Sequence, residues 1–148
     1  MSGEMVAIRQ MVTEDAAAVA ELTSQLGYPS SESDIRRRYD LIKDRADARL
    51  FVAHHADQRV IGWIHVQITY LLEADSRGEI WGLVVEESAR GAGVGRRLVE
   101  AAEKWAIARG ISAMALRSNH LRRDARAFYE RLGYTITKTQ NAFRKTLA

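Results

Sequence analysis

Residues 79–106 read EIWGLVVEESARGAGVGRRLVEAAEKWA, and this stretch decides the fold. The apolar run over 79–85 predicts a strand, and the apolar spacing over 94–109 predicts a long amphipathic helix. The turn between them has glycine at positions 91, 93 and 95. Glycines let backbone N–H groups approach a ligand closely, and a helix start adds unsatisfied donors and partial positive charge. The turn therefore predicts an anion site, usually for phosphate; the alternative is a tight turn that needs positive φ angles.

Two familiar phosphate-binding motifs do not fit this turn. The dinucleotide fingerprint G-x-G-x-x-G fails because Arg96 occupies the position of the third glycine. The P-loop fails because the chain contains no Gly-Lys-Ser or Gly-Lys-Thr.

Composition limits the class of protein. A length of 148 residues suits a single domain over 1–148. The absence of cysteine fits a reducing, cytoplasmic location. The net charge is +3, but the basic clusters are short and are not interleaved with aromatic residues, so no nucleic-acid partner is expected. The longest apolar stretch, over 60–72, contains His65, Gln67 and Thr69, so no membrane partner is expected either.

Hydrophobic periodicity and turn residues predict a mixed α/β domain around a sheet. The expected order is β-α-α-β-β-β-α-β-α-β-β. The expected strands cover residues 5–9, 50–54, 60–72, 79–85, 113–117, 134–137 and 142–146, and the expected helices cover 13–26, 31–42, 94–109 and 122–132.

The pattern R-x-x-G-x-G, over 90–95, resembles the acetyl-CoA pyrophosphate loop of the GNAT N-acetyltransferase superfamily. The strand before it, the helix after it and the segment NHLRRDARAFYERLGYTI at 119–136 follow that family's order. The resemblance implies a single-domain GNAT fold, α/β in the α+β sense. Its central sheet is mixed and mostly antiparallel, with six to seven strands flanked by four helices.

The same resemblance implies acetyl-CoA as cosubstrate. The strand before the loop is bulged in the family, and pantetheine pairs with its backbone at positions matching Leu83, Val84 and Val85. The full set of residues implied to bind the cosubstrate is Leu83, Val84, Val85, Arg90, Gly91, Ala92, Gly93, Val94, Gly95, Arg96, Asn119, Arg122, Ala125 and Phe128.

Residues 119–129 depart from the family's usual pattern. Many members have an asparagine seven residues before a tyrosine, but here Arg122 stands there and Asn119 lies three residues earlier. Asn119 either contacts pantetheine or caps the following helix. Arg122 or Arg123 serves a CoA phosphate or an anionic substrate group, or else is a solvated residue of the first helical turn. The pattern N-x-x-R-x-D-A-x-x-F-Y resembles a subgroup that includes aminoalkylphosphonate acetyltransferases.

Acyl transfer from a thioester to an amine needs no protein nucleophile, but it benefits from a base for the amine and an acid for the leaving thiolate. Tyr129 matches the family position whose hydroxyl reaches the CoA sulfur; the alternative is a core aromatic residue. Glu79 matches a glutamate that deprotonates the amine through water, with Glu73 and Asp75 as competitors; the alternative is a surface strand-end glutamate. No metal is expected, because the four histidines have no ligand spacing.

The expected function is acetylation of a primary amine on a small molecule. Aminoglycoside-like and polyamine-like acceptors suit the acidic residues at 73, 75, 79, 86 and 87, and aminophosphonates suit the arginines. Two alternatives remain open: a protein N-terminal or lysine acetyltransferase, and a non-catalytic acetyl-CoA-binding module. A homodimer is common in the resembling family, and the last strands would offer an edge for one.

Overall fold

The computed structural model describes residues 5–118 and 123–148, the side chain of Arg123 excepted, and the chain divides into two units, Met1–Leu116 and Arg117–Ala148. The first unit contains a five-stranded sheet of order β1-β2-β3-β4-β5. Its strands are β1 Val6–Gln10, β2 Ala48–His55, β3 Val60–Thr69, β4 Arg77–Val85 and β5 Met114–Leu116. Strands β1 to β4 pair antiparallel and β5 pairs parallel to β4, so the predicted mixed, mostly antiparallel sheet is confirmed.

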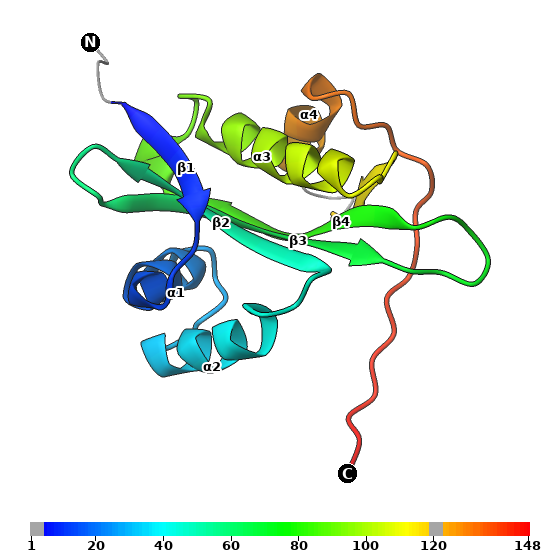
Figure 1. Ribbon diagram of the computed structural model, residues 1–148, viewed down its shortest axis with the longest axis horizontal. Coiled ribbons are helices and arrows are strands. Elements are labelled where there is room, and N and C mark those ends of the chain that lie inside the picture. The colour runs from blue at the N-terminus through cyan, green and yellow to red at the C-terminus, as the bar shows by residue number, and fades with distance from the viewer. Residues whose placement is uncertain (1–4, 119–122) are drawn as a thin grey trace. The chain divides into compact units, whose positions relative to one another are not determined.

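Three helices cover this sheet, with α1 (Ala16–Gln25) and α2 (Glu32–Ile42) on one side and α3 (Val94–Ala108) on the other (Figure 1). The core on the α1–α2 side includes Val19 and Leu22 of α1, Val52 of β2 and Val84 of β4. The α3 side is filled from the helix by the fully buried Leu98 and Val99, among others.

Local sequence signals account for the ends of these helices. The Ser31 hydroxyl accepts a hydrogen bond from the Asp34 backbone N–H at 3.0 Å, which caps α2. Gly110 follows α3 in the left-handed conformation, with φ 79°, as expected for a residue just past a helix end. Before α1, the short 3₁₀ turn Thr13–Asp15 is tied to β1, because Arg9 donates hydrogen bonds of 2.8 Å to both carboxylate oxygens of Asp15.

The second unit contains α4 (Arg123–Arg131), followed by a segment without regular secondary structure. The predicted strands over 134–137 and 142–146 are therefore wrong, and the sheet has five strands rather than six to seven. Ile136 in the first segment and Phe143 in the second are 58 and 93% exposed, so these apolar side chains find no buried surface. A strand pair without a further partner or a packed face is only marginally stable.

The first nine predicted elements are present in the expected order, with small shifts at their ends. Strand β4 begins two residues earlier than predicted, at Arg77, because Arg77 and Gly78 pair with Thr69 and Ile68 of β3. Strand β3 ends earlier than predicted, at Thr69, and Leu72 in the following hairpin is fully exposed.

Candidate active site

The glycine turn joins a 3₁₀ turn, Glu87–Ala89, to the start of α3. Gly91 and Gly93 have φ angles of 86° and 81°, so the turn does need residues that tolerate the left-handed region, while Gly95 lies inside α3. Space around the turn is open, since a Cβ placed at Gly91 or Gly93 would meet no atom within 4 Å. The positive φ angles of the tight-turn alternative are therefore present, and the space beside these glycines is also open to a ligand.

The N-terminus of α3 is open to a ligand. The N-cap is Gly93, and no side chain of the described residues caps the helix. The first intrahelical bond runs from Arg97 N–H to the Gly93 carbonyl, 3.1 Å, so the preceding N–H groups lack partners within the helix. Uncapped donors and the helix dipole favour an anion there.

The predicted arginines beside this turn are exposed and already make contacts. Arg90 Nε donates to the Val85 carbonyl at 3.3 Å, which folds its side chain back toward the end of β4. Arg96 lies in the first turn of α3 and pairs with Glu100 at 3.5 Å on the helix surface. Surface pairs of this kind are weak, so a phosphate could replace the Glu100 contact at little cost.

Strand β4 carries the predicted bulge. His65 of β3 pairs with Gly82 and Val66 pairs with Ile80, which leaves Trp81 as the extra residue on β4. Strand β5 pairs only with Gly78, Glu79 and Ile80. Beyond Ile80, the β5 side of β4 has no strand partner among the described residues, and Leu83, Val84 and Val85 lie on this open edge.

Glu79 lies inside β4 rather than at its start, between Gln67 of β3 and Ala115 of β5. Its side chain is only 5% exposed, so the alternative of a surface strand-end glutamate is wrong. Arg77 Nε donates to Glu79 Oε1 at 3.3 Å. A buried carboxylate with one charged partner keeps acceptor capacity on its second oxygen.

The competing carboxylates Glu73 and Asp75 are exposed in the hairpin that follows β3. Arg77 was not predicted as a site residue, because its neighbours Ser76 and Gly78 have the composition of a turn.

Polar and aromatic side chains of β3 share a sheet face with Glu79. Trp63, His65 and Gln67 alternate along β3, and Gln67 pairs directly with Glu79. Burial lowers the pKa of His65, against a smaller opposing effect of its hydrogen bond to Gln67. The fold therefore favours the neutral form of the His65 ring.

The predicted site residues of the second unit that the structure describes, Ala125, Phe128 and Tyr129, lie on α4. Phe128 and Tyr129 are half-buried, and their rings meet edge to face at 5.0 Å between centroids. Tyr129 makes a second such contact with Tyr134 at 5.8 Å. Ala125 lies one turn before Tyr129 and is also half-buried. Asn119 and Arg122 lie outside the described residues.

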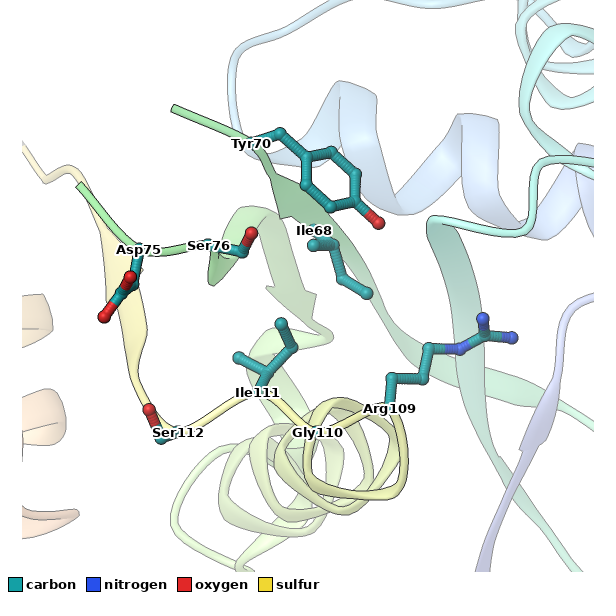
Figure 2. A pocket seen from close by; sticks show the side chains of 8 residues that line it. All are labelled: Ile68, Tyr70, Asp75, Ser76, Arg109, Gly110, Ile111 and Ser112. Carbon is teal, nitrogen blue, oxygen red and sulfur yellow. The ribbon is translucent and has the colours of Figure 1, made fainter. Parts of the chain in front are cut away.

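A cavity of about 460 Å³ lies at the other end of α3 (Figure 2). It is lined by residues at the ends of β3 and α3 and before β4: Ile68, Tyr70, Asp75, Ser76, Arg109, Gly110, Ile111 and Ser112. A helix of 15 residues is about 22 Å long, so the cavity is remote from the glycine turn. Among the described residues, none of those predicted to be catalytic or to bind the cosubstrate lines it, although the competing carboxylate Asp75 does.

Two other kinds of site are absent from the described ranges, 5–118 and 123–148. No three His, Asp or Glu side chains there are grouped to hold a metal ion. No helix there is long and apolar enough to cross a membrane.

Comparison with known proteins agrees with this geometry. The model of the Acetyltransferase (GNAT) family matches residues 16–134. The aminoglycoside N(6')-acetyltransferase type 1 of Stenotrophomonas maltophilia is 28% identical over 144 residues, covering 95% of this chain and 93% of that protein. The aminoalkylphosphonate N-acetyltransferase of Salmonella typhimurium is 33% identical over 148 residues, covering 95% and 90%.

A solved structure of aminoglycoside N-acetyltransferase AAC(6')-Iy in complex with CoA has the same fold. It superposes with a TM-score of 0.86 at 23% identity and covers 98% of this chain and 97% of that chain. The family match, which spans the glycine turn, β4 and α4, identifies the class of enzyme. The chain belongs to the GNAT family and is an acetyl-CoA-dependent N-acetyltransferase.

Proposed function

We propose that the chain transfers the acetyl group of acetyl-CoA to a primary amine of a small molecule by direct attack. The observation that carries this proposal is the combination, within one strand-turn-helix segment, of an uncapped helix start, an open strand edge and a buried carboxylate. In this proposal the pyrophosphate binds the turn over 90–96, and pantetheine pairs with the main chain of Leu83 to Val85.

The reaction divides between two side chains. Glu79 accepts a proton from the ammonium through water, the neutral amine attacks the thioester carbonyl, and the C–S bond breaks. Tyr129 donates its hydroxyl proton to the departing thiolate. Ala125 and Phe128, one turn and one residue before Tyr129, contact the cosubstrate in this proposal, as do Asn119 and Arg122.

The acceptor is a small amine because two related enzymes are named for such substrates, aminoglycosides and aminoalkylphosphonates. The acidic residues near β4 give only weak support for a polycationic acceptor, because some of them are already paired with arginines. Glu79 is paired with Arg77, and Glu86 accepts hydrogen bonds of 2.9 and 2.8 Å from Arg59. An acceptor with one ammonium and one anionic group therefore stays as well supported as a polyamine.

Three further predictions belong to this proposal: a single catalytic domain over 1–148, a cytoplasmic location and a homodimer. The alternative of a non-catalytic acetyl-CoA-binding module is set aside, because the chain belongs to an acetyltransferase family and a binding module has no need for the buried carboxylate on β4.

The test is calorimetric titration with acetyl-CoA, with NADH and ATP as controls. Micromolar binding of acetyl-CoA alone, about −8 kcal/mol, is the expected result. A thiol-release screen then follows, with an aminoglycoside, an aminoalkylphosphonate, a polyamine and a lysine peptide as acceptors. Failure to bind acetyl-CoA would overturn the proposed site, and release of thiol only with the peptide would overturn the small-molecule acceptor.

A further inference from the structure

Trp63 of β3 packs against the backbone of Gly82 in β4, at the position next to the bulge. A Cβ placed on Gly82 would lie 2.7 Å from Cη2 and 2.8 Å from Cζ3 of the indole. Gly82 does not have a positive φ, unlike Gly91 and Gly93. Its lack of a side chain is therefore required by the indole ring and not by the backbone conformation.

The bulge beside this contact decides which way Glu79 faces. Glu79 and Gly82 pair with Gln67 and His65, two residues of β3 that lie on the same face of the sheet. Residues three apart on a regular strand point to opposite faces, so the extra residue Trp81 brings them to one face. Without the bulge, one-residue slippage would turn Glu79 toward the α3 side.

The Trp63 ring has little freedom to move away from Gly82, because core residues pack against it. Its half-buried side chain packs against the core cluster formed by α1, α2 and the adjoining strands. Its Nε1 is buried and has no hydrogen-bond partner in the parts of the chain that the structure describes. A buried donor left without a partner is unfavourable for folding, and the packing of the ring against this core offsets that cost.

We propose that Trp63 is a positioning residue: its ring packs against Gly82 and so fixes the bulge of β4 at Trp81 and the pairing of β4 with β3. It thereby keeps Glu79 on the α1–α2 face and aligns the main chain of residues 82–85. The inference rests on the proposed function, in which Glu79 is the base and this main chain binds pantetheine.

The test is a double-mutant cycle of Gly82→Ala and Trp63→Phe, with acetyl-CoA affinity measured by calorimetry and kcat and KM measured with the best acceptor from the screen. Displacement of a reacting group by about 1 Å costs about 100-fold in rate, so Gly82→Ala should lower kcat by that order and weaken acetyl-CoA binding about tenfold. Adding Trp63→Phe removes the outer indole carbons and should restore much of both losses.

Gly78→Ala is the matched control on the same strand. A Cβ there would lie 2.5 Å from the Sδ of Met114, a flexible side chain that can turn away. It should leave kcat and acetyl-CoA affinity near those of the unsubstituted chain. If Gly82→Ala does not fold, Trp63→Phe alone is measured; it should fold and lower kcat with a smaller change in KM.

Two results would overturn the inference while leaving the proposed function intact: additive losses in the double variant, or unchanged kcat in Trp63→Phe. Failure of the unsubstituted chain to bind acetyl-CoA would count against the proposed function instead.

Discussion

Gly93 offers a direct test of the glycine turn as an acetyl-CoA site. Its φ of 81° is a left-handed conformation, which costs an alanine about 1–2 kcal/mol. A Cβ at this position would meet nothing within 4 Å, so Gly93→Ala introduces backbone strain without a clash. The variant either keeps the strained turn and loses that stability, or relaxes the turn and must recreate it when the ligand binds.

If the turn relaxes in Gly93→Ala, the energy of restoring it on binding sets the expected change in the Kd for acetyl-CoA. Recreating the turn at 1–2 kcal/mol raises the Kd for acetyl-CoA about 5- to 30-fold. Gly110→Ala is a closely matched control, because Gly110 has φ 79°, equally open surroundings, and a place at the opposite end of the same helix. A substitution that keeps the strained conformation should lower Tm by roughly 3–8 °C in a chain of this size.

Calorimetry and thermal unfolding of both variants separate strain from binding. The expected result is the full drop in Tm for Gly110→Ala, and for Gly93→Ala a smaller drop in Tm together with a higher Kd for acetyl-CoA. A smaller drop in Tm for Gly93→Ala than for Gly110→Ala without a rise in its Kd, or an equal rise in Kd for Gly110→Ala, would refute the argument that this turn holds the pyrophosphate.

Three further predictions concern named side chains. Glu79→Gln should lower kcat about 100-fold or more and change the shape of the pH–rate profile; an unaltered profile would remove Glu79 as the base. Tyr129→Phe should keep acetyl-CoA affinity and lose most turnover, and an unchanged kcat would remove Tyr129 as the acid. Burial acts to raise the pKa of Asp15, but the hydrogen bonds from Arg9 and Val12 outweigh it and hold that pKa below its usual value. Because the ionised form is favoured by the fold, its contribution is complete above about pH 4 and is lost as pH falls through the lower folded pKa. Asp15→Asn should therefore cost about 1–3 kcal/mol in urea unfolding at pH 7, with the difference from the unsubstituted chain shrinking toward pH 2; a difference that does not depend on pH would contradict this account.

The elements with a buried face could be predicted from the sequence. The helix at 94–108 and the strands over 60–69 and 77–85 bury one face or both, and that burial produces the periodicity from which they were inferred. The segment over 134–146 shows the limit of this reasoning. Its alternation around Ile136 fits a strand, but a strand also needs a neighbour, and no local pattern specifies one.

The part of the candidate site that a local motif defines could be predicted from the sequence. The contacts that other parts of the fold bring to it could not. The turn at 90–95 carries its own signal in its glycines. The hydrogen bond from Arg77 to Glu79 forms because both residues lie on the same face of β4. It was missed because the predicted strand began at residue 79 and left Arg77 in the preceding turn. The contact between the Trp63 ring and Gly82 joins residues on two different strands, so no local pattern predicts it. A sequence also does not show whether a glycine is required because a neighbour leaves no room for a side chain or because the backbone has a positive φ.

The open edge of β4 has a consequence for how this chain can vary. A ligand that pairs with an exposed strand edge is recognised through peptide N–H and C=O groups, which every residue except proline supplies in full. Leu83 and Val85 could then exchange for other apolar residues without altering that recognition, and an alanine scan across them would report packing rather than affinity. Proline, which removes a donor, is the substitution that such an edge cannot accept. A site that binds through the main chain therefore tolerates ordinary substitutions at these positions, and side-chain mutagenesis would not detect it.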